Sequence, residues 1–151
     1  KVLIVCDAPK GTEFFRDFLT QNGYEDILVV ENGEEARRIL VDTDFDLCLI
    51  NAPLRKESGE QLSIDIAEKN ICQVILFVKA EQCDAIADCV EDYGVITVSK
   101  PISRQLFWSA IKLARVAQRR ITMAQKENAK LQQKLDGLKT VSRAKCLLIS
   151  Y

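Results

Sequence analysis

Residues 46–51 read Asp-Leu-Cys-Leu-Ile-Asn, an apolar run that closes on an amide and is followed by Ala52-Pro53-Leu54. Four similar runs occupy residues 2–6, 27–30, 74–78 and 95–98. The runs are rich in Val, Ile and Leu and do not alternate with polar residues, a pattern typical of parallel strands buried on both faces. The sequence therefore predicts five strands of one parallel sheet.

Segments of helical length separate these runs. They lie at about residues 10–22, 33–41, 58–69 and 81–92, and from Ser103 onward. Gly23 and Gly94 follow the first and the fourth segment, where glycine commonly ends a helix. Strands that alternate with helices predict an α/β fold, and five strands in about 100 residues fit the flavodoxin-like doubly wound order 2-1-3-4-5.

Composition excludes several classes of protein. The 151 residues are 48% hydrophobic and 28% charged, as in soluble globular domains. No apolar run reaches the roughly 18 residues that a membrane span needs. The chain has no histidine, the usual base of Ser-His-Asp and Cys-His hydrolases. The six cysteines form no C-x-x-C pair, and most of them are predicted to be small buried side chains in a reducing cytoplasm, away from any membrane.

Charge is divided unevenly along the chain. Residues 1–99 carry nine Lys or Arg against twenty Asp or Glu, whereas residues 100–151 carry twelve against two. This asymmetry predicts two parts with different tasks.

The last helical segment keeps a seven-residue repeat of small or apolar side chains from Phe107 onward. We expect Phe107, Ala110 and Ile111 to pack on the sheet. The helix then extends as a parallel coiled coil that forms a homodimer. The predicted dimer seam consists of Ala114, Ala117, Ile121, Ala124, Asn128, Leu131, Leu135 and Leu138.

Asn128 is the strongly polar residue of this repeat. A single Asn at such a position pairs with its twin in a parallel dimer and fixes the register, at some loss of stability. The alternative is a surface Asn on a long solvated helix.

Polar residues follow the predicted strands at their carboxyl ends, where doubly wound sheets place their sites. Cys6 and Asp7 follow the first strand, Asn51 the third and Lys79 the fourth. Lys100-Pro101 follows the fifth.

Up to about residue 115 the chain resembles the receiver domain of two-component response regulators. The motifs that carry the resemblance are Val5-Cys6-Asp7, residues 45–54, Val78-Lys79-Ala80 and Ser99-Lys100-Pro101. The resemblance implies two acids after the first strand that bind Mg²⁺ and an aspartate after the third that takes a phosphoryl group. It also implies a Ser or Thr after the fourth strand and a Lys after the fifth that hold this group.

The sequence departs from the family at three of these positions. Cys6 replaces the first acid, Asn51 the phosphoacceptor and Lys79 the hydroxyl residue, while Asp7 and Lys100 are kept. Thr97 stands where the family often has an aromatic switch residue. An amide oxygen is a poor nucleophile, and Mg²⁺ prefers several hard oxygen ligands.

We therefore expect a receiver that is not phosphorylated, holds no metal or cofactor and is not an enzyme. Two placements of Lys79 remain open. It joins Asp7 and Lys100 in an ion network around the Asn51 amide, or it points into solvent.

Basic residues crowd the extended helix and the segment after it. A basic face predicts contact with a polyanion, and the alternative is the solvated exterior of a coiled coil. The candidates for polyanion contact are Arg115, Arg119, Arg120, Lys126, Lys130, Lys134, Arg143 and Lys145.

Residues 143–149 resemble the opening of the ANTAR domain, an RNA-binding module of transcription antitermination regulators. The resemblance implies a dimeric regulator whose C-terminal modules bind RNA loops. The predicted domains are a receiver-like domain (1–113), a coiled coil (114–140) and the start of an ANTAR-like domain (141–151), which would be truncated here. Two alternatives are a dimerisation module that acts on protein or DNA and a flavodoxin-like ligand-binding protein.

Overall fold

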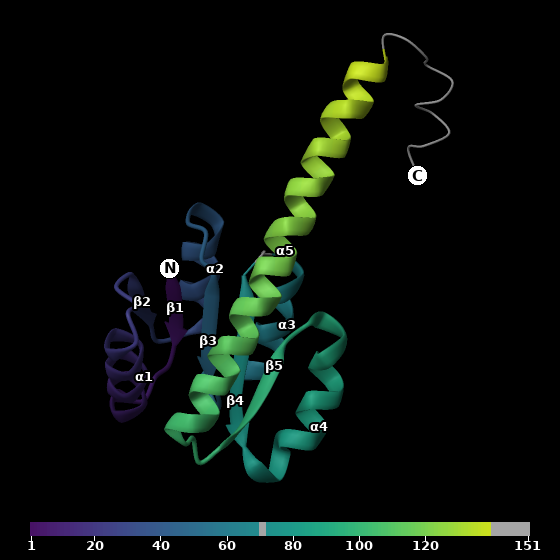
Figure 1. The fold of residues 1–151 in the computed structure, drawn as a ribbon. Helices are drawn as coiled ribbons and strands as arrows, with labels where there is room; N and C mark the ends of the chain where they lie inside the picture. Colours follow the sequence, from purple (N-terminus) through teal and green to yellow (C-terminus); the bar gives the residue numbers. More distant parts are fainter. Residues whose placement is uncertain (70–71, 140–151) are drawn as a thin grey trace. The chain divides into compact units, whose positions relative to one another are not determined.

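The computed structural model describes residues 1–69 and 72–139, without side-chain detail at residues 121, 122, 125 and 133–139. Strands alternate with helices along the chain (Figure 1). The strands are β1 (Val2–Val5), β2 (Ile27–Val30), β3 (Leu47–Asn51), β4 (Gln73–Lys79) and β5 (Ile96–Lys100). The helices are α1 (Pro9–Gln21), α2 (Gly33–Asp42), α3 (Gly59–Lys69), α4 (Ala80–Val90) and α5 (Arg104–Lys139), with a 3₁₀ turn at Glu91–Tyr93.

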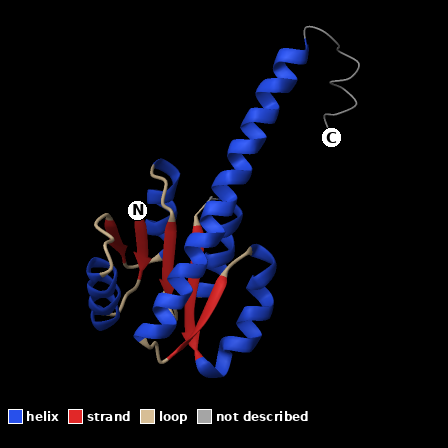
Figure 2. Ribbon diagram, in the orientation of Figure 1, coloured by secondary structure: helices blue, strands red, loops and turns tan. Residues whose placement is uncertain are grey.

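All five strands are parallel and lie in the order β2-β1-β3-β4-β5 (Figure 2), which confirms the predicted sheet. Val5 pairs with Ile50, so β1 and β3 end side by side. Lys79 pairs with Lys100 at the ends of β4 and β5. The register therefore brings the predicted polar residues to one edge of the sheet.

Side chains of alternate strand residues enter two separate cores, as the pleat of a strand requires. Leu3, Ile50 and Leu76 are buried in the core that α2, α3 and α4 cover. Ile4, Leu49 and Phe77 are buried in the core that α1 and α5 cover. Burial on both faces explains why the strand sequences are apolar without alternation.

The first turns of α5 are held on the sheet by an aromatic cluster. Phe107 is fully buried, and its ring centroid lies 4.5 Å from that of Phe18, 5.4 Å from that of Phe15 and 5.5 Å from that of Phe77. Ala110 and Ile111 are buried beside it. The expectation that this part of the repeat packs on the sheet is confirmed.

The chain divides into two compact units, residues 1–118 and residues 119–151. The sequence placed the end of the receiver-like domain at residue 113. Ala114 is 1% exposed and belongs to the core of the first unit, so it is not available for the predicted dimer seam. Within the described residues, no helix combines the length and the apolar character that a bilayer crossing requires.

Candidate functional site at the carboxyl edge of the sheet

Asn51 and Cys6 face each other at the edge formed by β1 and β3. The Asn51 Nδ2 donates a hydrogen bond to the Cys6 Sγ over 3.3 Å, and the Cys6 thiol donates to the carbonyl of Ala8 over 3.4 Å. The Oδ1 of Asn51 is buried, and no residue within the described part of the chain donates a hydrogen bond to it. The amide thus occupies the predicted position with one of its two polar atoms unused.

Helix α1 approaches this pair through Gly11. A Cβ at residue 11 would lie 3.0 Å from the Asn51 Nδ2 and 3.1 Å from the Cys6 Sγ. Both distances are shorter than an ordinary van der Waals contact. Glycine is therefore the residue that lets α1 close over the end of β3.

Lys100 reaches across the edge from β5. Its Nζ donates a hydrogen bond to the carbonyl oxygen of Ala52, the residue after Asn51. Burial lowers the pKa of Lys100 from its ordinary value, with a further lowering from Lys79, while Cys6 and Asp7 act in the opposite direction. Lys100 thus holds the chain segment that leaves β3.

Asp7 is paired with a residue that the sequence did not single out. Its Oδ2 lies 3.6 Å from the Nε of Arg55, and the two side chains are 18% and 84% exposed. Arg55 follows β3 by four residues, in an irregular loop whose path no periodicity reveals. Exposure of Arg55 to water makes this a weak pair.

Lys79 is exposed at the end of β4. No ion pair joins it to Asp7 within residues 1–69 and 72–139, so the predicted network of Asp7, Lys79 and Lys100 does not form. Its side chain instead lines a cavity of about 470 Å³ together with Glu57, Glu60 and Glu81. Of the two placements expected for Lys79, the structure has the solvent-facing one. Thr97 is half-buried on β5, where it pairs with Leu76.

The donor atoms at this edge do not suit the Mg²⁺ that the resemblance implies. They are one carboxylate (Asp7), one thiol (Cys6) and one amide (Asn51), whereas Mg²⁺ prefers hard oxygen ligands in octahedral geometry. Across the described residues, no group of three or more His, Cys, Asp or Glu side chains is placed to hold a metal ion. No step that needs a metal can be derived from these residues.

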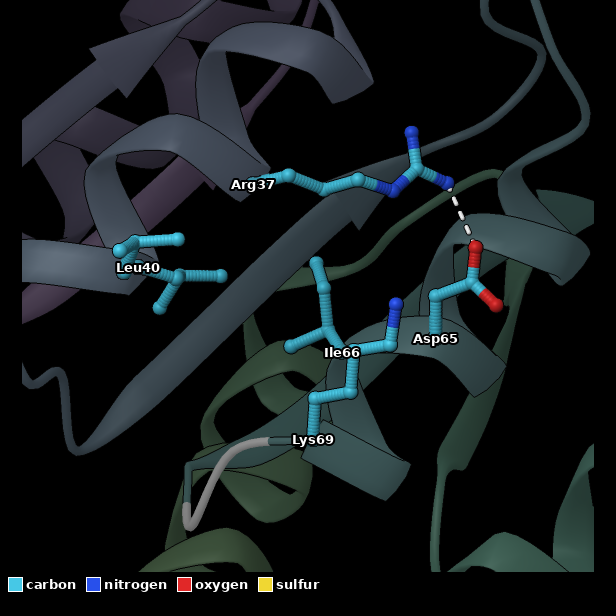
Figure 3. Close-up of a pocket in the computed structure, with 6 residues that line it drawn as sticks. Arg37, Leu40, Asp65, Ile66 and Lys69 are labelled. Atoms are coloured by element: carbon cyan, nitrogen blue, oxygen red, sulfur yellow. Dashed lines mark hydrogen bonds and ion pairs between the residues drawn. The ribbon is translucent and has the colours of Figure 1, made fainter.

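A second cluster ties the loop after β3 to the helices beside it. The Arg37 guanidinium on α2 makes two 2.9 Å hydrogen bonds to the Glu57 carboxylate and one of 2.7 Å to Asp65 on α3. Figure 3 shows Arg37 and Asp65 meeting at one side of a cavity of about 420 Å³. The hydrogen bond from Arg37 lowers the pKa of Asp65. We call Arg37, Glu57 and Asp65 together the Arg37 clamp.

The predicted seam residues beyond Ala114 differ in exposure. Ala117 is half-buried, and Ala124, Asn128 and Leu131 are exposed. The structure does not describe the side chains of Ile121, Leu135 and Leu138. The seam itself therefore stays a prediction.

Five of the eight basic candidates can be placed. Arg115, Arg119, Arg120, Lys126 and Lys130 are exposed on α5. The Arg115 guanidinium also stacks over the rings of Tyr24 (4.9 Å) and Trp108 (5.8 Å), which gives it a role within its own unit. The side chain of Lys134 is not among the described ones. The ANTAR-like segment 141–151, which includes Arg143 and Lys145, also lies outside the described residues.

Comparison with known proteins identifies the family to which these features belong. The family described as response regulator receiver domain matches residues 2–112. The transcriptional regulatory protein PdtaR of Mycobacterium tuberculosis is 28% identical over 98% of this chain and 72% of its own length.

Solved structures agree. The signal receiver domain of a signal transduction histidine kinase from Syntrophus aciditrophicus is 25% identical over 75% of this chain and 87% of its own, with a TM-score of 0.65. An adenylate cyclase from Rhodopirellula baltica shares the fold with a TM-score of 0.77, at 14% identity over 85% of this chain and 96% of its own. The expected resemblance to receiver domains is confirmed, and the chain belongs to the response regulator receiver domain family.

Proposed function

We propose that this chain is a signal-transduction regulator whose receiver domain works without phosphorylation of residue 51. The observation that carries the proposal is the Asn51 amide at the end of β3, hydrogen-bonded to Cys6 where the family has a carboxylate. An amide oxygen does not form an acyl phosphate, and the edge lacks the ligands that would bind the metal. The domain would then act through conformation and assembly, not through catalysis.

Treatment with acetyl phosphate and Mg²⁺ is expected to leave the intact mass of the protein unchanged. The reason is the absence of a nucleophilic carboxylate at residue 51. A receiver domain with an aspartate at the matching position serves as the positive control in the same reaction. A stable added phosphoryl group on this chain would contradict the proposal.

The proposal includes a homodimer formed through a parallel coiled coil in the distal part of α5. Ala124, Asn128 and Leu131 support it, because they are exposed at coiled-coil spacing and Leu131 is 56% exposed. An apolar side chain exposed at such a position gains from burial against a second helix. The single Asn would fix the register of the pair.

Sedimentation velocity is expected to find the full 151-residue chain as a dimer. Asn128→Leu should associate more tightly, with mixed or higher oligomers, because a polar residue at this position specifies the dimer at some loss of stability. Lys126→Leu is the matched control, since Lys126 is exposed on the same helix outside the repeat. A monomeric wild type at micromolar concentration would remove the dimer from the proposal.

The same proposal assigns RNA as the partner of this regulator, in transcription antitermination. Three features support the assignment: the ANTAR-like residues 143–149, the exposed basic residues of α5, and the similarity to a transcriptional regulatory protein. RNA loops are recognised through unpaired bases together with phosphate neutralisation. A specific antiterminator would use both.

We expect a protein that joins this chain to a complete ANTAR-like module to bind hairpin RNA with an affinity that falls as salt rises. Replacing Lys126 and Lys130 with Gln should reduce the slope of log affinity against log salt by about 2 at most, since each phosphate contact contributes roughly one. The matched duplex DNA is the comparison. Equal affinity for DNA would favour the alternative, a receiver-type dimerisation module that acts on DNA or protein.

A further inference from the structure

We propose that the cavity beside α1 binds a small organic monoanion with an apolar body, such as an aryl or alkyl carboxylate. This α1 cavity has a volume of about 310 Å³ and is lined by Lys10, Gly11, Phe14, Asn51, Lys100 and Ile102, among others. Small-molecule sites in proteins begin at about 300 Å³. The inference builds on the proposed loss of phosphorylation at Asn51 and supplies a different input to the same edge.

The lining of the α1 cavity is cationic within an otherwise acidic domain. Lys10 and Lys100 line it, and no Asp or Glu does so. Residues 1–99 as a whole carry twenty acids against nine basic residues. Asp7, the acid of this edge, is paired with Arg55 and does not line the cavity. A negatively charged ligand is therefore favoured there over a neutral or cationic one.

Lys100 is the strongest anchor for such an anion. Its ammonium has three donors, and the structure gives one of them an acceptor, the Ala52 carbonyl. Within the described residues no carboxylate lies within ion-pair distance of it. Burial lowers the pKa of Lys100 because it removes water from around the charged ammonium. A bound carboxylate would replace the interactions lost with that water. Asp7 acts on the Lys100 charge only from beyond ion-pair distance, so the ammonium can still take a direct partner from outside.

Asn51 adds a second polar contact in the same cavity. Its buried Oδ1 accepts no hydrogen bond from the described residues, and Asn51 is part of the cavity lining. A buried acceptor without a donor is unfavourable. A ligand hydroxyl or amide N–H beside the carboxylate would satisfy it once the Asn51 side chain turns toward the cavity, so hydroxy acids and acylamino acids are expected to bind better than simple acids.

The remaining lining explains why the ligand should have an apolar body. Phe14 and Ile102 are half-buried, and the Phe14 ring packs edge-on against Phe107 at 5.9 Å. A ring or a short alkyl chain removes the apolar surface of Phe14 and Ile102 from water, whereas inorganic phosphate leaves this surface exposed to solvent. The cavity on the other side of the edge, near Lys79, is lined by Glu57, Glu60 and Glu81 and repels anions.

The test is a titration of the ¹⁵N-labelled 151-residue protein, followed by amide chemical shifts without Mg²⁺ or phosphodonor. The probes are benzoate, 3-phenylpropionate and mandelate, which carries the extra hydroxyl. Comparison compounds are 3-phenylpropionamide, 3-phenylpropylamine, propionate and inorganic phosphate. We expect saturable shifts at Gly11, Asn51 and Lys100 with the aromatic acids, strongest for mandelate. The amide and the amine should bind at least about tenfold more weakly.

Matched variants separate the two lysines from general charge effects. Lys100→Gln should weaken binding about tenfold, and Lys10→Gln about threefold because Lys10 is exposed and its charge is screened. Lys56→Gln removes the same charge from an exposed position that does not line the cavity, and it should change nothing. Ile102→Glu places an acid in the lining and should abolish binding, which keeps the test open if Lys100→Gln does not fold.

Three results would overturn the inference. They are the absence of saturable shifts with every aromatic acid, equal binding of the neutral amide, and unchanged affinity in both Lys10→Gln and Lys100→Gln. These outcomes are independent of the intact-mass experiment. Phosphorylation of the chain would refute the proposed function and leave the titration to be judged by its own result.

Discussion

Phe107→Ala is expected to lower the free energy of unfolding by about 3–5 kcal/mol, the range for removing a large aromatic side chain from a packed core. Phe107 is fully buried, and its ring contacts aromatic residues of α1 and β4, so the truncation leaves a cavity between the sheet and two helices. Alanine is the best helix former, so the loss is due to packing and not to helix propensity.

Urea denaturation followed by the fluorescence of Trp108 measures this effect, because the single tryptophan of the chain is the next residue along α5. Leu106→Ala is the control, since Leu106 is 43% exposed on the same turn, and it should change stability by less than about 1 kcal/mol. Protein concentration is held constant, because a dimer would couple association to unfolding. Equal losses in both variants would mean that the aromatic cluster does not anchor α5.

Arg37→Met should lower the free energy of unfolding by about 1–3 kcal/mol at neutral pH. The substitution leaves Glu57 and Asp65, both about three-quarters buried, without their cation. The estimate stays below that for a fully buried pair because the Arg37 side chain is 35% exposed. Arg38→Met is the control: Arg38 is exposed on the same helix.

The effect of the Arg37 clamp depends on pH with a definite sign. The hydrogen bond from Arg37 lowers the pKa of Asp65 below its ordinary value of 3.8, so the folded state binds a proton less readily than the unfolded state. Stability from this carboxylate is therefore complete above pH 3.8 and is lost as pH falls through the lower folded pKa. The difference between wild type and Arg37→Met should shrink across that acidic range. A constant difference would exclude Asp65 as the cause.

Gly33 gives the clamp an independent test. A Cβ at residue 33 would lie 1.7 Å from the Glu57 Oε1, so Gly33→Ala must displace the carboxylate that Arg37 holds. Alanine is favoured over glycine by about 1 kcal/mol in a helix interior, and by less at residue 33, the first residue of α2. Gly33→Ala should therefore destabilise the wild type but be neutral or stabilising in the Arg37→Met background. The same effect in both backgrounds would show that Glu57 is not fixed by Arg37.

The sequence was sufficient to predict what depends on local pattern. Five apolar runs predicted five strands, and the strand order then placed Cys6 and Asn51 at one edge, where their side chains do meet. Phe107 was expected on the sheet and is buried there. These inferences succeed because strand burial and helix periodicity are written in neighbouring residues.

Contacts between distant loops could not be predicted in the same way. Asp7 is paired with Arg55, which lies in an irregular loop, and Arg37 reaches residues 20 and 28 positions further along the chain. No periodicity marks such pairs. Ala114 was placed in the dimer seam because the seven-residue repeat continues through the last contacts of α5 with the sheet, so the pattern does not reveal which partner buries each residue.

Gly11 limits the size of the side chains that residues 6, 11 and 51 can have together. Because a Cβ at residue 11 would lie 3.0 Å from the Asn51 amide nitrogen and 3.1 Å from the Cys6 sulfur, residue 11 can grow only where residue 6 or residue 51 becomes smaller or moves. Relatives of this chain that carry a residue larger than glycine at position 11 should therefore also differ at position 6 or 51. An aspartate at residue 51 has the same size as asparagine, so it fits beside Gly11 without a change on α1, whereas a larger side chain at residue 51 does not.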